Sequence, residues 1–208
     1  MQPGNSPRGR FITLEGVDGA GKSSYLPVLA ERIRKGGHEV VVTREPGGTP
    51  LAERLRELLL AEPMDPATET MLMFAARADH VRRVIQPALE AGRWVLCDRF
   101  TDATHAYQGG GKGVPEALIV ALASEAHPDL EPDLTLLFDC PWEVSKARLA
   151  GTGRPLDRFE REDREFFQRV RARYLERASR EASRFAVIDA SRSPEEINGS
   201  VEDVFIGI

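Results

Sequence analysis

Cysteine is scarce in this sequence: Cys97 and Cys140 are the only two among 208 residues, and each stands beside an apolar run. Two isolated cysteines exclude the disulfide framework of a small secreted protein and favour reduced, buried thiols. No apolar run reaches the roughly 20 residues that a membrane helix needs. The polar segment 1–10 also lacks the apolar core of a signal peptide. We therefore expect a cytoplasmic protein that has no membrane partner.

An excess of basic charge is also missing, because 28 Lys and Arg face 33 Asp and Glu and the net charge is −5. Such a balance provides no general positive field for nucleic acid or an anionic membrane. No cluster of residues has the spacing of metal ligands. Lysine is rare as well, with four lysines against 24 arginines. An arginine is therefore assigned a role below only where its position supports one.

What the chain does contain is a glycine-rich motif near its start. A short apolar strand at 11–14 runs into GVDGAGKS at 16–23, and a helical pattern begins near Ser24. This is the pattern of a phosphate-binding P-loop, including the strand before it and the helix after it. The glycines let backbone N–H groups turn inward around a polyphosphate. Lys22 would reach the β- and γ-phosphates and the Ser23 hydroxyl would ligate Mg²⁺, so ATP and Mg²⁺ are the expected ligands.

Apolar runs and helical patterns alternate along the chain. Strands are expected at 11–14, 40–42, 94–97, 134–139 and 185–188. Helices are expected at 24–36, 50–61, 67–91 with an interruption or bend at Pro87, 115–126, 142–149, 160–182 and from 193 onward. The wholly apolar run 40–42 is typical of a strand buried in a parallel sheet. Segment 100–113, with four glycines, is interpreted as a functional loop that is helical only at its start. We expect one domain over 1–208, a three-layer α/β fold with a five-stranded parallel sheet and a short lid at about 150–160.

Ligands of such sheets bind beyond the carboxyl ends of the strands, and this rule selects candidate residues. It brings together the P-loop, the loop 44–48, Asp98 with Arg99, and the segment 189–192. Asp98 can hold Mg²⁺ through water or orient the attacking group, although a turn or capping Asp is the alternative. Asp18 inside the P-loop would repel phosphate, so it either faces a substrate hydroxyl or is an outward-facing turn residue.

Several arginines occupy positions from which they can contact a phosphate-bearing acceptor. Arg56, Arg77 and Arg99 can give bidentate contacts to it, with surface solvation as the alternative for each. Arg154 and Arg158 in the lid can neutralise charge in the transition state, as an arginine supplied in cis does. Phe74, three residues before Arg77, offers a π-face, although a core Phe is the commoner explanation.

With these motifs in place, nearly the whole chain resembles the thymidylate kinases. The resemblance rests on GVDGAGKS at 16–23, TREPGG at 43–48, FAAR at 74–77, CDRF at 97–100, AYQGG at 106–110 and LDR at 156–158. It implies phosphoryl transfer from ATP to dTMP with Mg²⁺, in dTTP biosynthesis, by a homodimer. A deoxynucleoside kinase and a non-catalytic module that senses nucleotides are the alternatives. The loop 44–48 and the arginines favour a nucleotide acceptor, and the intact Lys22, Ser23 and Asp98 favour catalysis.

The resemblance also implies a role for individual residues. The ATP site would comprise Gly16, Val17, Asp18, Gly19, Ala20, Gly21, Lys22, Ser23 and Ser24 with Arg148 and Arg192, and the metal would be held by Ser23 and Asp98. Catalysis would use Lys22, Asp98, Arg154 and Arg158. The dTMP site would comprise Asp18, Glu45, Pro46, Arg56, Phe74, Arg77, Arg99, Thr104, Tyr107 and Gln108. Within it, Arg56 and Arg99 would bind the phosphate, Phe74 would stack on thymine, Arg77 would donate to O4, Thr104 and Gln108 would contact the N3 side, and Tyr107 would favour deoxyribose.

Two positions of the resemblance leave alternatives. The family has one version with an arginine in the P-loop and another with the catalytic arginine in the lid, and Gly19 here implies the lid version. Arg148, Arg154 and Arg158 are each candidates for that arginine. In some relatives the stacking aromatic lies four residues before the arginine, where this chain has Met73, and we assign the stacking to Phe74.

Overall fold

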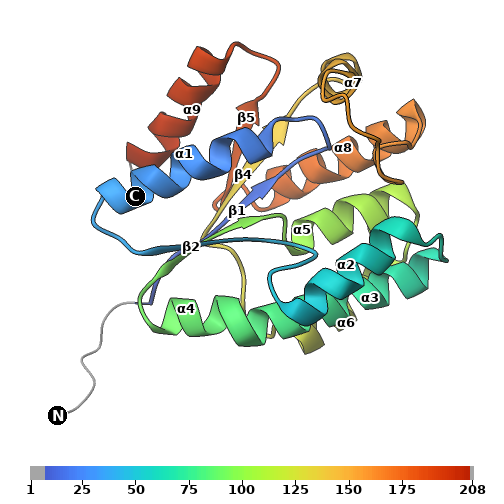
Figure 1. The fold of residues 1–208 in the computed structure, drawn as a ribbon, viewed down its shortest axis with the longest axis horizontal. Helices are drawn as coiled ribbons and strands as arrows, with labels where there is room; N and C mark the ends of the chain where they lie inside the picture. The colour runs from blue at the N-terminus through green and yellow to red at the C-terminus, as the bar shows by residue number, and fades with distance from the viewer. Residues whose placement is uncertain (1–7, 207–208) are drawn as a thin grey trace.

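The computed structural model describes residues 8–206; residues 1–7, which include most of the polar N-terminal segment, and 207–208 lie outside the description. Five strands form one parallel sheet, as expected: β1 (Phe11–Glu15), β2 (Val40–Arg44), β3 (Trp94–Asp98), β4 (Leu134–Asp139) and β5 (Phe185–Asp189). Their order is β2-β3-β1-β4-β5, so the strand that leads into the P-loop is central (Figure 1). The carboxyl ends of β1, β2 and β3 therefore meet at one edge of the sheet.

Helices connect the strands and cover both faces of the sheet. They are α1 (Lys22–Lys35), α2 (Pro50–Ala61), α3 (Pro66–His80), the π-helix η1 (Val81–Ile85), α4 (Gln86–Glu90), α5 (Thr101–Thr104), the π-helix η2 (His105–Gly111), α6 (Glu116–Ala126), α7 (Trp142–Ala150), α8 (Arg164–Arg180) and α9 (Pro194–Ile206). Helices α1 and α9 lie together on one side of the sheet, and α4 with α2, α3 and α6 lies on the other (Figure 1). No helix among residues 8–206 is both long and apolar enough to cross a bilayer.

The core follows from the alternation of side chains along the central strands. Ile12 and Leu14 of β1 are fully buried with residues of α1 and α9, whereas Phe11 is buried with residues of η1 and α4 on the opposite face. Phe11 also packs edge-to-face on Phe100, with ring centroids 4.9 Å apart. Both faces of β1 are thus buried, and the P-loop follows a strand that is tightly packed on both sides.

The expectation that the apolar run 40–42 forms a buried strand is wrong in one respect. The run does form β2, but β2 is at the edge of the sheet, and Val42 is 45% exposed. Strand order decides this outcome, since a run of three valines fits a central and an edge strand equally well.

The long helix expected at 67–91 is interrupted, as predicted, but ahead of Pro87. The chain passes from α3 into η1, where the N–H of Gln86 bonds to the carbonyl of Val81, five residues earlier. Pro87 has no N–H to donate to the carbonyl four residues before it, so an α-helical ladder cannot continue through this turn. The widened turn of η1 takes up the mismatch.

Segment 100–113 is more helical than expected, because α5 and η2 run from Thr101 to Gly111. The two glycines Gly110 and Gly111 allow α8 to pack closely on η2. A Cβ at Gly110 would lie 2.7 Å from Cβ of Arg173, and one at Gly111 would lie 2.5 Å from the ring of Phe166. Tertiary packing therefore overrides the poor helix propensity of glycine here.

Helix α8 begins at Arg164, four residues later than the expected start at 160. Asp163 caps it, since its carboxylate accepts from the N–H of Phe166 at 2.7 Å. Residues 151–163 consequently form one connection between α7 and α8, which we call the lid segment. This segment contains both predicted lid arginines.

Candidate functional site

The P-loop lies at the carboxyl end of β1, in the conformation that its glycines require. Gly16 has a φ of +132°, and a Cβ there would lie 2.2 Å from the carbonyl oxygen of Phe138. The buried Lys22 donates its Nζ to the carbonyl oxygens of Gly16 at 2.8 Å and Val17 at 3.0 Å. Burial lowers the pKa of Lys22, and the charge of Arg99 lowers it further, although three carboxylates oppose both effects. A polyphosphate placed in the loop would add negative charge beside Lys22 and would stabilise its charged ammonium form.

Two arginines predicted to bind ATP lie around the P-loop. Arg148 of α7 donates to the carbonyl oxygen of Ala20 at 3.2 Å and to that of Ala190, after β5, at 2.8 Å. It thus joins the P-loop to the far loop of the sheet. Arg192 is half exposed and pairs with Asp189 at 3.0 Å, close to the same loop. Both lie on the side of the P-loop away from the loop 44–48.

Asp98 and Ser23 offer the oxygens expected of a metal site. The Oδ1 atom of Asp98 is buried and has no hydrogen-bond partner among residues 8–206, while Ser23 is exposed at the start of α1. Over the same residues, His, Cys, Asp and Glu form no group of three that could hold a metal by themselves. An unpartnered carboxylate oxygen beside a P-loop fits Mg²⁺ that takes its other ligands from phosphate and water.

Asp18, Arg99 and Tyr107 form a cluster between the P-loop and β3. Arg99 donates to Oδ1 of Asp18 at 2.6 Å, and the Tyr107 hydroxyl donates to Oδ2 at 2.7 Å. Burial raises the pKa of Asp18, but the charges of Arg99 and Lys22 outweigh it, so the net shift is downward. Asp18 is therefore a firm anion at neutral pH. Arg99 has a φ of +72°, which is uncommon for a residue with a side chain and occurs often at functional sites.

Glu15, the last residue of β1, was not singled out from the sequence. It is fully buried and accepts from the backbone N–H of Phe100 at 2.6 Å and from the Tyr174 hydroxyl at 2.7 Å. It therefore holds the turn after β3 in place. Burial and the nearby Asp102 raise its pKa to about 7, against the charge of Arg99. The sequence offers one sign that Glu15 has a role, because an acidic residue stands at the end of a mostly apolar strand.

A groove of about 600 Å³ lies next to this cluster. Nine of the residues predicted for the acceptor line it, namely Asp18, Glu45, Pro46, Arg56, Arg77, Arg99, Thr104, Tyr107 and Gln108. Leu60, Met73, Phe100, Ala103, Asp157 and Phe159 complete its lining. The groove thus combines an apolar wall with arginines and a few polar groups, the usual composition of a small-molecule site.

Arg77 is held in the wall of the groove by a buried network. Its Nε donates to Glu45 at 2.6 Å, and its Nη2 donates to the carbonyl oxygen of Phe100 at 3.2 Å and to Thr104 at 3.1 Å. Nη1 is buried and has no partner among the described residues. Arg77 therefore keeps one donor group for a ligand. His80, which the sequence reasoning missed, steadies Glu45 from the other side through Nδ1 at 3.0 Å.

The charge of Arg77 also acts on Glu45. Burial raises the pKa of Glu45, but the guanidinium of Arg77 and the bond to His80 lower it more strongly. The carboxylate stays ionised although both side chains of the ion pair are buried. A buried, fully bonded ion pair of this kind fixes the direction of the guanidinium.

The structure corrects the placement of Phe74. This residue is 2% exposed and belongs to a core cluster with Val114, Ile119 and Ala126, whereas Met73 lines the groove. Its ring lies 4.6 Å from the Arg77 guanidinium carbon. Met73 and Arg77 are four residues apart and share the face of α3 that borders the groove, whereas Phe74 is rotated toward α6. Phe74 supports Arg77 from within the core and is not positioned to stack on a ligand in the groove.

Arg56 and Arg99 provide the positive charge of the groove. Arg56 donates to the carbonyl oxygen of Pro46 at 3.0 Å. Burial lowers the pKa of Arg56, and the charges of Arg44 and Arg99 lower it too, while Glu53 opposes them. Cations that repel each other in a partly buried site are stabilised by an anion placed between them.

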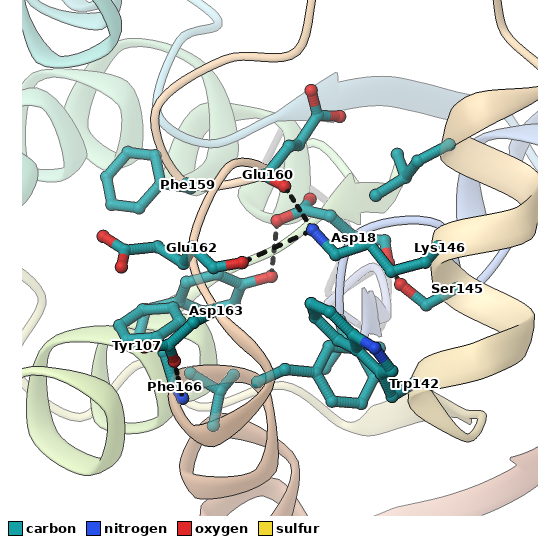
Figure 2. A pocket seen from close by; sticks show the side chains of 14 residues that line it. Asp18, Tyr107, Trp142, Ser145, Lys146, Phe159, Glu160, Glu162, Asp163 and Phe166 are labelled. Atoms are coloured by element: carbon teal, nitrogen blue, oxygen red, sulfur yellow. Dashed lines mark hydrogen bonds between the residues drawn. The ribbon is translucent and has the colours of Figure 1, made fainter.

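The lid segment closes over the groove and over a second hollow next to the P-loop. Figure 2 shows Lys146 of α7 reaching into the lid, where its Nζ donates to the carbonyl oxygens of Glu160 at 2.8 Å and Glu162 at 3.4 Å. The two predicted lid arginines have different surroundings. Arg154 is half exposed and pairs with Glu160 inside the lid, whereas Arg158 pairs with Glu69 of α3 and donates to the carbonyl oxygen of Leu59 at 2.5 Å.

Comparisons with known proteins point to one family. A family model described as thymidylate kinase matches residues 14–201. The thymidylate kinase of Bordetella pertussis is 57% identical over 197 residues, which cover 95% of this chain and 94% of that protein. The thymidylate kinase of Methylobacillus flagellatus is also 57% identical over 197 residues, covering 95% and 97% of the two chains. A crystal structure of thymidylate kinase from Ehrlichia chaffeensis is similar with a TM-score of 0.76 and 34% identity, covering 95% and 99%.

Proposed function

The chain belongs to the thymidylate kinase family and phosphorylates dTMP, and we propose that the groove beside the P-loop is where dTMP binds. The observation that carries this proposal is the juxtaposition of two kinds of group in one groove. Arg56 and Arg99 supply charge for the phosphate that the acceptor already bears, and Arg77 presents an unpartnered Nη1 for its base. The family uses ATP as the phosphoryl donor.

On this proposal ATP occupies the P-loop. The backbone N–H groups of residues 16–24 and the ammonium of Lys22 would hold its phosphates, with Arg148 and Arg192 on the nucleotide side. Ser23 and Asp98 would hold Mg²⁺, which would neutralise charge on the phosphate oxygens when bound. The unpartnered Oδ1 of Asp98 supports this assignment.

The acceptor would lie with its phosphate toward the P-loop and its base deep in the groove. Arg56 and Arg99 would bind the phosphate, and Asp18 with Tyr107 would face the sugar. Thr104 and Gln108 would contact the N3 side of thymine, next to Arg77 at O4. Met73 and Phe100, which line the groove, provide its apolar wall in place of the stacking first assigned to Phe74.

The transfer would need no general base. The attacking group is an oxygen of the acceptor's own phosphate, which is already largely ionised at neutral pH because its second pKa is about 6. The task of the protein is therefore to bring two anions together and to neutralise the charge that develops. Lys22 and one lid arginine would supply that charge, and Arg99, bonded to both Asp18 and Tyr107, would hold the acceptor phosphate in line.

A homodimer is part of the proposal, and the exposed apolar side chains of α2, α3 and α6 support it. Leu51 and Leu58 of α2, Met71 of α3 and Val120 of α6 are each between 42% and 51% exposed. An apolar surface spread over neighbouring helices is typical of a protein–protein interface. We also propose a cytoplasmic location, which the buried free thiols of Cys97 and Cys140 support.

A steady-state assay with dTMP, thymidine, dUMP and dCMP as acceptors tests the function. We expect dTMP to be the best substrate and thymidine to be inactive, since Arg56 and Arg99 then have no phosphate to bind. Turnover of thymidine but not dTMP would identify a deoxynucleoside kinase. Absence of turnover with every acceptor, together with ATP binding, would identify a sensing module. Light scattering of the purified protein tests the dimer, and a monomeric mass at micromolar concentration would contradict it.

A further inference from the structure

Glu69 is a completely buried carboxylate on α3 that the function described so far does not use. Two hydrogen-bond donors and one further guanidinium converge on it. Gln108 of η2 donates its Nε2 to Oε1 at 2.8 Å, Lys112 donates to Oε2 at 2.8 Å, and Arg158 of the lid segment places Nη2 2.5 Å from Oε2. Glu69 itself does not line the groove, and it reaches the groove only through Gln108, which does.

Lys112 and Arg158 decide whether Oε1 of Glu69 accepts or donates the hydrogen bond to Gln108. Lys112 donates to Oε2 and the Arg158 guanidinium lies beside the same atom, so the two cations favour a carboxylate that accepts hydrogen bonds and donates none. The amide of Gln108 must therefore turn its nitrogen toward Glu69. A flipped amide would place two acceptor oxygens against each other in a buried site, which is unfavourable because neither oxygen then has a donor.

This orientation leaves one polar atom of the Gln108 side chain for a ligand. Gln108 is 2% exposed and lines the groove, and its Oε1 makes no hydrogen bond to any residue between 8 and 206. Thr104 precedes Gln108 by four residues and accepts from Arg77, so the acceptor Oε1 and the unpartnered donor Nη1 of Arg77 belong to the same wall. The groove thus offers a donor and an acceptor on one wall.

A donor next to an acceptor matches only one of the two pyrimidine edges. Thymine presents O4, an acceptor, beside N3–H, a donor. Cytosine presents an amino group, a donor, beside an unprotonated N3, an acceptor. Cytosine would therefore place donor against donor at Arg77 and acceptor against acceptor at Gln108. A site that reads polar groups in this way rejects the wrong partner far more strongly than a site that reads shape.

Resting on the proposed binding of dTMP in the groove, we propose that Glu69 is a positioning residue that selects a pyrimidine with a protonated ring nitrogen. It does not touch the base. Its carboxylate locks the Gln108 amide with the oxygen available to N3–H, and so it sets the preference of the site for thymine over cytosine. The lid arginine Arg158 shares the same carboxylate, which connects closure of the lid to the group that reads the base.

The experiment compares kcat/KM for dTMP and dCMP in the wild-type protein and in Glu69→Gln. A neutral amide at 69 can donate or accept, so the Gln108 amide is free to flip, and we expect the dTMP-to-dCMP ratio to fall at least tenfold. A weaker anchor for Arg158 would slow both substrates alike and would leave the ratio unchanged. An unchanged ratio overturns the proposal. If the wild-type protein fails to turn over dTMP at all, the proposed function itself has failed, and the inference with it.

Lys112→Met is the matched control. It removes one partly exposed charge partner of Glu69 but leaves the bond to Gln108 and the charge of Arg158, so we expect the ratio to change by less than about threefold. A change as large as that of Glu69→Gln would overturn the amide-locking role.

Should Glu69→Gln fail to fold, binding to the wild-type protein still tests the reading of N3–H. The measurement is how well dTMP that carries a methyl group on N3 competes with dTMP for the wild-type protein. We expect it to bind at least tenfold more weakly than dTMP, and equal binding would overturn the proposal.

Discussion

Arg77 donates its Nε to Oε2 of Glu45 over 2.6 Å, and both side chains are only 3% exposed. This ion pair joins α3 to the loop after β2. It is the centre of a network that His80 extends to Thr43, through Nδ1 on Glu45 and Nε2 on the Thr43 hydroxyl at 2.7 Å. The guanidinium that is proposed to read the base is thus fixed by Glu45, which His80 and Thr43 hold in turn.

Removal of Glu45 should therefore destabilise the protein strongly. In Glu45→Leu the charge of Arg77 stays buried without its partner, and we expect the free energy of unfolding to fall by about 3 kcal/mol or more. Urea denaturation measures this change. Glu143→Gln, which breaks the exposed pair with Arg164, is the control, and it should change stability by less than about 1 kcal/mol. A loss at Glu45 no larger than that of the control would contradict the role of the pair.

The lid arginines should differ in their effect on turnover. Arg154 has its carboxylate partner, Glu160, within the lid itself, so the pair can move as a unit toward the P-loop. Arg158 is anchored outside the lid, by Glu69 and Leu59. We expect Arg154→Ala to lower kcat by about a thousandfold, as loss of an arginine finger does, and Arg158→Ala to lower it less. Saturating dTMP and ATP isolate kcat from binding.

Arg164→Ala, at the first turn of α8 and exposed, serves as the control for the lid variants and should leave kcat within about twofold. If neither lid variant changes kcat, the charge in the transition state must be neutralised elsewhere. Arg148, which bonds to the P-loop at Ala20, would then be the residue to replace.

The methyl group of thymine should contribute only modestly to selectivity. Leu60 and Met73 line the groove and can contact a methyl group, but one methyl in an apolar pocket is worth about 1–3 kcal/mol. We expect kcat/KM for dTMP to exceed that for dUMP by about 10- to 200-fold. A ratio above about 10⁴ would show that uracil is rejected through polar groups, which the proposed contacts at O4 and N3 do not provide.

The parts of this protein that follow local rules could be predicted from its sequence. The P-loop has a fixed spacing, and the rule on the carboxyl ends of strands places Glu45, Asp98 and Arg99 at one edge of the sheet, where β2 and β3 end side by side. Other features depend on strand order or on packing. Val42 is exposed because β2 is at an edge, and residues 105–111 are helical because α8 packs against their glycines.

The acidic residues of the site were the hardest to find. Glu15 and Glu69 are fully buried, and their partners come from residues between 39 and 159 positions away along the chain. A charged residue on an apolar strand or a helix is usually exposed, so its sequence context does not distinguish the two cases. Only the folded chain brings the donors that make burial of these carboxylates possible.

His127 provides a prediction for the dependence of stability on pH. It lies behind the groove, where Nδ1 donates to the carbonyl oxygen of Leu130 at 3.1 Å and Nε2 accepts from the Thr101 hydroxyl at 2.7 Å. Its ring also packs on Phe100, with centroids 4.8 Å apart. Burial lowers the pKa of His127 to about 4, and the charge of Arg77 adds to this effect. The folded protein therefore holds this imidazole in its neutral form.

Between pH 6.5 and about 4 the unfolded chain binds a proton at His127 that the folded protein does not bind. The free energy of unfolding consequently decreases as the pH falls through this window, by about 3 kcal/mol in total from this residue. Glu15 acts in the opposite sense. Its folded pKa of about 7 lies above the ordinary 4.5, so its contribution to stability decreases as the pH rises between these values. The profile of the wild-type protein alone therefore does not isolate His127.

The difference between the wild-type protein and His127→Gln does isolate it, because Glu15 is common to both. Glutamine can keep one of the two hydrogen bonds but cannot take up a proton, so the variant should be less stable than the wild type at pH 7. That deficit should shrink by about 3 kcal/mol as the pH falls to 4, since only the wild type loses the contribution of a neutral histidine. Urea denaturation at half-unit intervals of pH measures both profiles. Two parallel profiles would mean that His127 titrates alike in the folded and unfolded chains, and the burial argument would then be wrong.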